Sequence, residues 1–442
     1  MTAFSAAVFQ NEFMPASATE VNAVVTVTAS GGAAAAAPSE KIVVLVVDCS
    51  GSMGAPDTKI RGARKAAASA LSMLPDGTLF ALVAGTEVAQ CVYPPTAPRT
   101  VPQLARADET TRGAAIAVAR QLQSGGGTRI SSWIDIVRVL VEPFPQAIRL
   151  AYLMTDGKDE GEQPADLMGA LTRATGAFQC DCRGVGTDWN VAELRAISSA
   201  LLGEVDIIKE AAAIEADFQA FLERAIGKTV AAVNLRIWTP KGSVVRFVKQ
   251  VAPSIEDLTA KATQVNDLTR DYPTGAWAGD ESRDYHVCVD VPAGSVGDEK
   301  LAARVTLMVG DEQASQALVR AVWTDDDALS TRINPQVAHY TGQAELADAI
   351  QEGLAARAAG DLDTATMKLG RAVQLAAQSG NDGTMKLLRK VVEVENEETG
   401  TVKVKRSVEA ADEMELDTRS TRTVRVNKAP PAAPAAAPEE AK

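Results

Sequence analysis

Three side chains that carry oxygen ligands stand at alternate positions of one short loop. They are Asp48, Ser50 and Ser52 in the segment DCSGSMG, which directly follows the apolar run KIVVLVV. Mg²⁺ prefers such hard oxygen ligands in near-octahedral geometry and keeps several of its waters. In an open α/β sheet, ligands bind outside the carboxyl ends of the strands. The loop is therefore a candidate site for a divalent cation.

Two later loops add matching side chains. Thr128 follows a run of three glycines, where the backbone can turn tightly, and Asp156 follows the apolar run IRLAYLM. Because both apolar runs are predicted to be strands of one sheet, the loops that follow them meet at the same edge. The sequence thus predicts a site for Mg²⁺, or Mn²⁺ in its place, formed by Asp48, Ser50, Ser52, Thr128 and Asp156.

The elements that position this site alternate along residues 41–226. Short apolar runs typical of strands buried on both faces are separated by amphipathic, Ala-rich segments typical of helices. This alternation predicts an α/β domain with a mostly parallel sheet and helices on both faces.

The pattern changes on both sides of that domain. Residues 227–334 contain successive strand patterns separated by turn residues, which predicts an antiparallel β-sandwich. Residues 1–40 comprise further strands and a linker. Because a helix-covered parallel sheet is a poor host for these strands, we expect residues 1–30 to complete the sandwich. The α/β domain would then be an insertion within it.

The C-terminal part divides into two predicted regions. Residues 335–398 are helical in pattern and are expected to form a small hairpin that packs on the sandwich; residues 399–442 form a polar and Pro/Ala-rich tail, expected to be largely disordered. In this tail Thr418, Thr421 and Thr423 alternate with arginines. A Ser/Thr kinase could phosphorylate them for a phosphothreonine-binding (forkhead-associated) domain. The alternative is a solvated polar linker.

The five oxygen-bearing residues, in this order and spacing, resemble the metal-ion-dependent adhesion site of the von Willebrand factor A domain, in an intracellular bacterial type. The resemblance covers roughly residues 40–226. It implies that the hydroxyls bind the metal directly and the acids directly or through water. An open coordination position then accepts an acidic group of a partner protein. It also places Asp188 and Trp189 at the same edge, where Trp189 either anchors a partner or packs on the following helix.

Enzymatic function is disfavoured by the residues. The only histidines, His286 and His339, lie outside the α/β domain; DCSGS is not a G-x-S-x-G nucleophile elbow, and no P-loop is present. We therefore expect an interaction module that acts as a scaffold or an assembly or signalling factor. One alternative, from family resemblance, is a substrate adaptor of a MoxR-type AAA+ ATPase. Another is a hydrolase that uses Asp48 and Asp156 with the metal.

Composition limits the range of partners and compartments. The 442 residues carry a net charge of −13, which argues against a general nucleic-acid binder and against binding to an anionic membrane surface. The five cysteines are scattered and odd in number, so a reducing compartment is favoured over a disulfide framework. No apolar run reaches the length of a membrane span, and no signal peptide is apparent. A cytoplasmic protein is expected.

Overall fold

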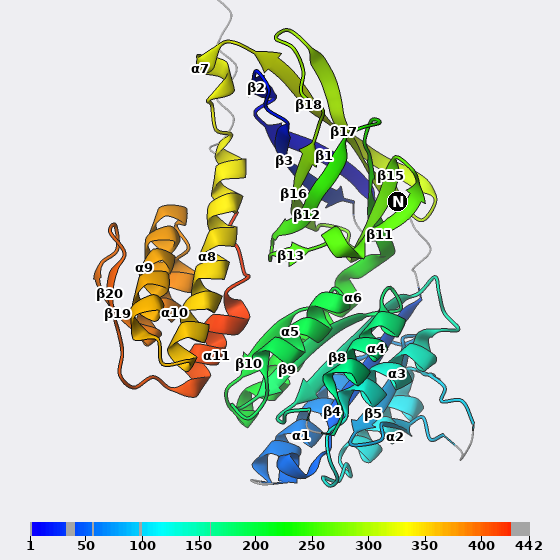
Figure 1. The fold of residues 1–442 in the computed structure, drawn as a ribbon. Coiled ribbons are helices and arrows are strands. Elements are labelled where there is room, and N and C mark those ends of the chain that lie inside the picture. The colour runs from blue at the N-terminus through cyan, green and yellow to red at the C-terminus, as the bar shows by residue number, and fades with distance from the viewer. Residues whose placement is uncertain (1, 32–39, 55–56, 97–99, 160, 426–442) are drawn as a thin grey trace, which may run out of the picture.

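The computed structural model describes residues 2–31, 40–54, 57–96, 100–159 and 161–425. These residues form an α/β domain, a β-sandwich and a C-terminal helical part (Figure 1). Among the helices that the structure describes, none combines the length and apolar character needed to cross a membrane.

The α/β domain has one sheet in the order β10-β9-β8-β4-β5-β6, with β7 also paired to β5. Strands β10, β9, β8, β4 and β5 are parallel, whereas β6 and β7 run antiparallel to β5. The strands are β4 (Lys41–Asp48), β5 (Leu79–Gly85), β6 (Gln90–Tyr93), β7 (Ala105–Arg106), β8 (Ile148–Thr155), β9 (Gln179–Val185) and β10 (Val205–Ile208). The predicted mostly parallel sheet is confirmed.

Helices cover both faces of this sheet, because successive side chains of a strand point to opposite faces. Val43, Leu45 and Val47 of β4 join the core with α1, α2 and α6, while Ile42 and Val44 join the core with α3, α4 and α5. These helices are α1 (Thr58–Met73), α2 (Glu109–Ala119), α3 (Ile130–Val141), α4 (Pro164–Ala174), α5 (Val191–Ala200) and α6 (Ile214–Gly227), with 3-10 turns η1 (Gly51–Gly54) and η2 (Ala211–Ala213).

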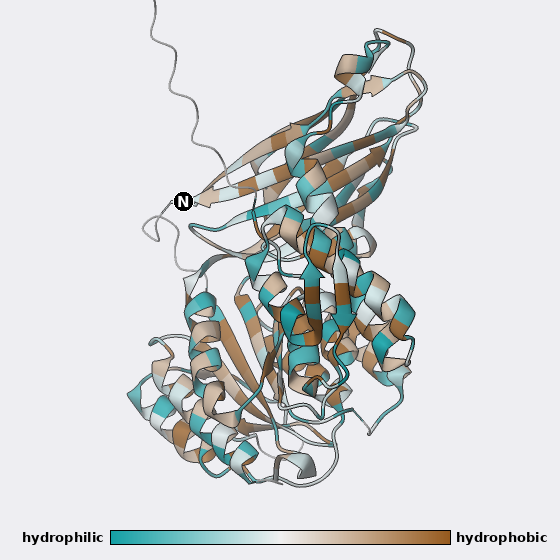
Figure 2. Cartoon of the chain, turned by 90° about the vertical axis from the view of Figure 1, so that its left-hand side faces the viewer, coloured by the Kyte–Doolittle hydropathy of each residue, from teal (hydrophilic) through white to brown (hydrophobic). Residues whose placement is uncertain are grey.

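The β-sandwich consists of two sheets around one apolar core. One has the order β1-β3-β16-β12-β13 and the other β14-β15-β11-β17-β18-β2. In Figure 2 hydrophobic and hydrophilic residues alternate along these strands, as expected where one face is buried. The strands are β1 (Ala3–Gln10), β2 (Phe13–Pro15), β3 (Glu20–Ser30), β11 (Lys228–Trp238), β12 (Val244–Ala252), β13 (Glu256–Asp257), β14 (Thr263–Asn266), β15 (Thr269–Ala278), β16 (Ser282–Asp290), β17 (Glu299–Val309) and β18 (Glu312–Thr324), with a 3-10 turn η3 (Thr259–Lys261).

The N-terminal strands belong to this sandwich, so the α/β domain is inserted within it, as predicted. Strand β3 lies between β1 and β16, and Val25 is opposite Tyr285 in the antiparallel register. Strand β2 extends the second sheet by pairing in parallel with β18. Both sheets therefore combine strands from before and after the inserted domain.

The C-terminal helical part contains more than the expected hairpin. Helices α8 (Pro335–Ala358) and α9 (Leu362–Ser379) are antiparallel neighbours, and α10 (Asp382–Val391) packs beside them; a short α7 (Asp327–Ser330) precedes α8. Residues 392–396, expected to be helical, instead form β19 (Val392–Asn396), paired with β20 (Thr401–Val404). The start of α8 packs on the sandwich, where the Tyr340 hydroxyl donates to Asp284 of β16.

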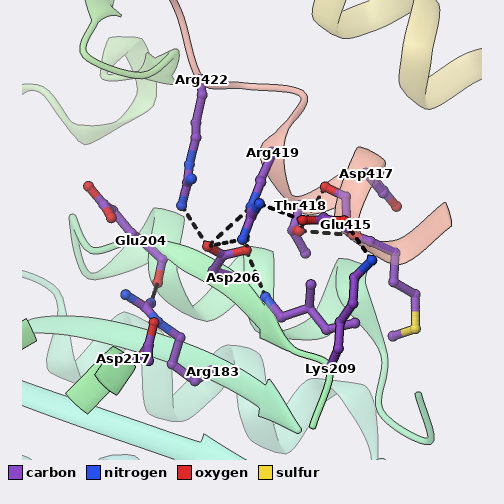
Figure 3. Close-up of polar contacts among 12 residues, drawn as sticks. Arg183, Glu204, Asp206, Lys209, Asp217, Glu415, Asp417, Thr418, Arg419 and Arg422 are labelled. Atoms are coloured by element: carbon purple, nitrogen blue, oxygen red, sulfur yellow. Dashed lines mark hydrogen bonds and ion pairs between the residues drawn. The ribbon is translucent and has the colours of Figure 1, made fainter. Parts of the chain in front are cut away.

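The prediction of a largely disordered tail over 399–442 is wrong for residues 399–425. These residues form β20, helix α11 (Ala410–Arg419) and a segment that pairs with the sandwich near Ser254. Their order comes from ion pairs to distant residues, such as Arg422 Nη2 with Asp206 Oδ2 at 2.7 Å (Figure 3). The Pro/Ala-rich end of the tail, residues 426–442, lies outside the described residues.

Candidate functional site

The first loop of the candidate site begins where β4 ends. The backbone N–H of Ser50 donates to Asp48 Oδ1 at 2.7 Å, which turns the chain directly after the strand. The Ser50 and Ser52 hydroxyl oxygens then lie 2.9 Å apart. Asp48 and Ser50 are buried, whereas Ser52 is exposed. The loop thus presents a row of oxygen atoms that runs from the sheet edge to solvent.

The glycine-rich second loop is hydrogen-bonded to the first through backbone groups. The N–H of Gly125 donates to the carbonyl of Cys49 at 2.8 Å, and the N–H of Gly51 donates to the carbonyl of Gly126 at 2.9 Å. Gly126 has a φ of 80°, in the left-handed region where glycine is favoured. These contacts hold Thr128, which is largely buried, beside the first loop.

The third loop places Asp156 after β8. The Ser52 hydroxyl donates to Asp156 Oδ1 at 2.7 Å, and the Thr155 hydroxyl donates to Asp48 Oδ2 at 2.5 Å. Asp156 is fully buried. Thr155 was not singled out from the sequence, although it directly precedes Asp156. It fixes the orientation of the Asp48 carboxylate.

All five predicted ligands converge beside Gly157. A Cβ atom at Gly157 would lie 3.1 Å from Ser52 Oγ, 3.6 Å from Thr128 Oγ1 and 4.0 Å from Asp48 Oδ2. The three loops therefore surround one small space with hydroxyl and carboxylate oxygens. This donor set fits a hard divalent cation. Elsewhere in the described ranges, no group of three or more His, Cys, Asp or Glu side chains is placed to hold a metal.

The electrostatics of the site also favour a cation. Burial raises the pKa of Asp48, and the nearby charge of Asp156 raises it further against the hydrogen bonds from Thr155 and Ser50. Burial and the charge of Asp48 likewise raise the pKa of the neighbouring Cys49 thiol to about 12, so it is an inert thiol. A positive charge between the two carboxylates would relieve their mutual repulsion.

Lys59, which the sequence did not point to, places a positive charge beside Asp156. It lies in the first turn of α1, and its Nζ is 2.6 Å from Asp156 Oδ2 and 3.6 Å from Asp188 Oδ2. Burial opposes its charge, but the hydrogen bond and the charge of Asp156 outweigh burial and raise the pKa of Lys59. The available signal was a basic residue at the start of the helix that follows the first loop, at the same sheet edge.

The burial of Trp189 corrects its interpretation as a partner anchor. It is 3% exposed, and its Nε1 donates to the carbonyl of Gly186 at 2.9 Å. The ring packs so closely on Gly184 that a Cβ there would lie 1.9 Å from it. The packing alternative is correct, since Trp189 shares a core with Leu194 of α5. Asp188 is 75% exposed in its side chain and remains a predicted partner contact.

The three threonines of the predicted phosphorylation segment are held in the folded structure. Thr418 is buried, and its hydroxyl donates to the carbonyl of Met414, so phosphorylation of Thr418 on the folded chain is contradicted. Thr423 is half-buried and donates to the carbonyl of Val251 at 2.6 Å. The half-buried Thr421 accepts a hydrogen bond at its carbonyl from Ile255. Modification of Thr421 or Thr423 stays a prediction, and the solvated-linker alternative does not hold.

Family models match two parts of the chain. Residues 41–207 match the von Willebrand factor type A domain, and residues 374–420 match the von Willebrand factor type A C-terminal domain. The first match contains all five residues of the candidate site. The second ends after α11, which agrees with the ordered structure of that helix. A comparison with curated proteins finds no match.

Solved structures extend the similarity to nearly the whole chain. A von Willebrand factor type A protein from Catenulispora acidiphila is 49% identical with a TM-score of 0.91, over 96% of this chain and 98% of that one. The ArnB paralog VWA2 from Sulfolobus acidocaldarius is 14% identical with a TM-score of 0.58, over 96% and 100% of the two chains. Human COPII-coat protein Sec24c is 11% identical with a TM-score of 0.53, over 90% of this chain and 60% of that one. The last two share the fold.

The domain model matches residues 41–207, and the Catenulispora acidiphila protein is 49% identical over 96% of this chain. Together these two findings show the family. This chain belongs to the von Willebrand factor type A family.

Proposed function

We propose that the chain is a non-enzymatic interaction protein that binds an acidic group of a partner protein through a divalent cation. The cation, Mg²⁺ or Mn²⁺, is held by Asp48, Ser50, Ser52, Thr128 and Asp156. The observation that carries the proposal is the convergence of their side chains around Gly157. When bound, the cation supplies a Lewis-acidic position that a carboxylate of the partner can occupy.

Hydrogen bonds within the chain order this site in the absence of the cation. Hydrogen bonds from Thr155 and Ser50 fix the Asp48 carboxylate at the buried end. The exposed Ser52 marks the end that faces solvent, where a partner can approach. Such a preorganised site loses little conformational freedom on binding.

The placement of the histidines supports a binding role over catalysis. His286 lies on β16, and its Nε2 is 2.9 Å from Asn22 Oδ1. His339 lies on α8, and its Nε2 is 2.7 Å from the carbonyl of Val424. Both histidines belong to parts of the chain outside the α/β domain, which argues against either as a general base for Ser50 or Ser52.

The proposal is tested by affinity capture from lysate with and without Mg²⁺. The wild type is compared with Asp48→Ala and Thr128→Ala, which remove one carboxylate and one hydroxyl of the site. Asp267→Ala and Thr172→Ala are matched controls on exposed positions outside it. Calorimetric titration with Mg²⁺ on the same proteins measures cation binding directly.

We expect a partner that is retained by the wild type and both controls with Mg²⁺, and lost with chelator or with either site variant. Its identity then separates a scaffold or assembly factor from an adaptor of an AAA+ ATPase. Equal capture by all proteins under both conditions would show that the cation plays no part in recognition.

A further inference from the structure

Lys59 makes an ion pair with a proposed ligand of the cation. Its side chain is only 16% exposed, and its Nζ lies 2.6 Å from Asp156 Oδ2. The other oxygen of this carboxylate accepts the hydrogen bond from Ser52. Asp156 thus has a hydrogen bond at one oxygen and an ion pair at the other, although the proposed function requires it to face a cation.

The pair has a clear electrostatic role. Asp48 and Asp156 are two fully buried carboxylates that bracket one space, and burying such charges without compensation is costly. Within the residues that the structure describes, Lys59 is the basic side chain in ion-pair contact with Asp156, one of these two carboxylates. Its ammonium therefore supplies positive charge beside Asp156, a proposed ligand of the cation.

A second carboxylate lies within reach of the same ammonium. Asp188 Oδ2 is 3.6 Å from Lys59 Nζ, and its side chain is 75% exposed to solvent. A lysine suits movement between two acids, because its compact charge sits on a flexible stem with rotatable donors. A small rotation of the stem would shorten the Asp188 contact as the Asp156 contact lengthens.

We propose that Lys59 competes with the cation for Asp156. In the metal-free chain Lys59 pairs with Asp156, and when the cation binds, Lys59 moves to pair with Asp188. This inference rests on the proposed function and adds its regulation. Cation affinity is then the difference between metal coordination and the Lys59–Asp156 pair. A partner that binds the cation-loaded form favours release of Lys59, because the two events are thermodynamically linked.

The test is calorimetric titration with Mg²⁺ of the full chain and its Lys59→Gln variant. Removing the competitor should tighten Mg²⁺ binding about tenfold, the size expected for the loss of one partly buried pair. Lys65→Gln is the matched control. Lys65 lies on the same helix, and its Nζ forms an ion pair with Glu215 Oε2 at a distance of 2.8 Å. Lys59→Arg keeps the charge and should stay close to the wild-type affinity.

Asp188→Asn tests whether Asp188 accepts the Lys59 ammonium after it leaves Asp156. Without Asp188 the release of Lys59 costs more, so Mg²⁺ binding should weaken several-fold in the Lys59 background. In Lys59→Gln the same substitution should have little effect, because no ammonium remains to be received. This double-mutant cycle isolates the coupling between the two side chains.

A separate readout uses the metal-free protein. Lys59→Gln should melt at a lower temperature than the wild type in chelator, and Mg²⁺ should restore more of its stability. This pattern requires that Lys59 compensates the buried carboxylates when the cation is absent.

The outcomes distinguish the two proposals. If the wild type binds Mg²⁺ and Lys59→Gln binds it equally or more weakly, the competitor role is overturned while the proposed function stands. If no variant binds Mg²⁺, both are overturned. If only Lys59→Gln binds it, Lys59 blocks the site outright and the competitor role is supported.

Discussion

The Asp206 carboxylate is one of the groups that attach α11 to the α/β domain, beside ion pairs made by Arg195 and Lys209. Asp206 lies on the edge strand β10, and its side chain is 8% exposed. It accepts hydrogen bonds from Arg419 Nε at 3.0 Å and from Arg422 Nη2 at 2.7 Å (Figure 3). Burial alone would raise the pKa of Asp206, but the charges of Arg422 and Arg419 outweigh it and lower the pKa. Replacing both arginines by alanine leaves this buried carboxylate without its cationic partners.

The expected magnitude follows from the exposure of each group. Arg422 is 49% exposed and partly screened by water, so Arg422→Ala alone should cost about 1 kcal/mol. In the double variant Arg419→Ala/Arg422→Ala the carboxylate is buried and unpaired, and the cost rises to about 3 kcal/mol. Adding Asp206→Asn removes the unpaired charge. The triple variant should therefore be more stable than the double variant.

Native-state hydrogen exchange of the α11 amides is the appropriate assay, since it reports opening of this segment rather than unfolding of the whole chain. A cost of about 3 kcal/mol should speed their exchange roughly 100-fold. Exchange in the double variant within about threefold of wild type would refute the anchoring role of Asp206. A triple variant that opens as readily as the double variant would refute the assignment of the cost to a buried unpaired charge.

Three further outcomes follow from the described contacts. Trp189→Ala should lower the free energy of unfolding by about 3–5 kcal/mol in urea, because it empties a buried site on Gly184; a change below about 1 kcal/mol would contradict the burial of that ring. Burial, with a smaller contribution from the charge of Lys249, lowers the pKa of His286 to about 4. The folded state therefore resists protonation, so stability is fully present above about pH 6.5 and falls as the pH drops toward 4, by about 2 kcal/mol at pH 5. His286→Gln should lose this pH-dependent part of the stability. If its stability depends on pH as in the wild type, the lowered pKa of His286 is contradicted. Chelation should lower the melting temperature by less than about 10 °C, since the sheet is complete without a cation; complete unfolding would indicate a structural metal.

The candidate site could be assembled from the sequence because each loop directly follows a recognisable strand. KIVVLVV and IRLAYLM are buried on both faces, so their apolar character is continuous, and parallel strands bring their ends to one edge. The placement of Asp48 and Asp156 follows from this topology alone. The same pattern could not give the contact of Lys59, which depends on where the first turn of α1 lies relative to β8.

Long-range contacts explain what the sequence did not predict. Helix α11 is polar and has little apolar patterning, so nothing local distinguishes it from a solvated tail. Its stability comes from contacts such as Arg419 with Asp206, which are 213 residues apart. Trp189 was ambiguous for a related reason. The space that accepts its ring exists because Gly184 has no side chain, and that space is visible only when strand and loop are brought together.

The insertion of one domain within another has a consequence for synthesis of the chain. The hydroxyls of Thr28 on β3 and Ser282 on β16 lie 3.0 Å apart, although 254 residues separate them. As translation proceeds from the N-terminus, β1 and β3 leave the ribosome long before their sandwich partners exist. The entire α/β domain can fold during this interval, while the apolar face of β3 remains unpaired. The growing chain therefore carries an unpaired strand edge through most of its synthesis, and such edges are prone to aggregation until their partners are made.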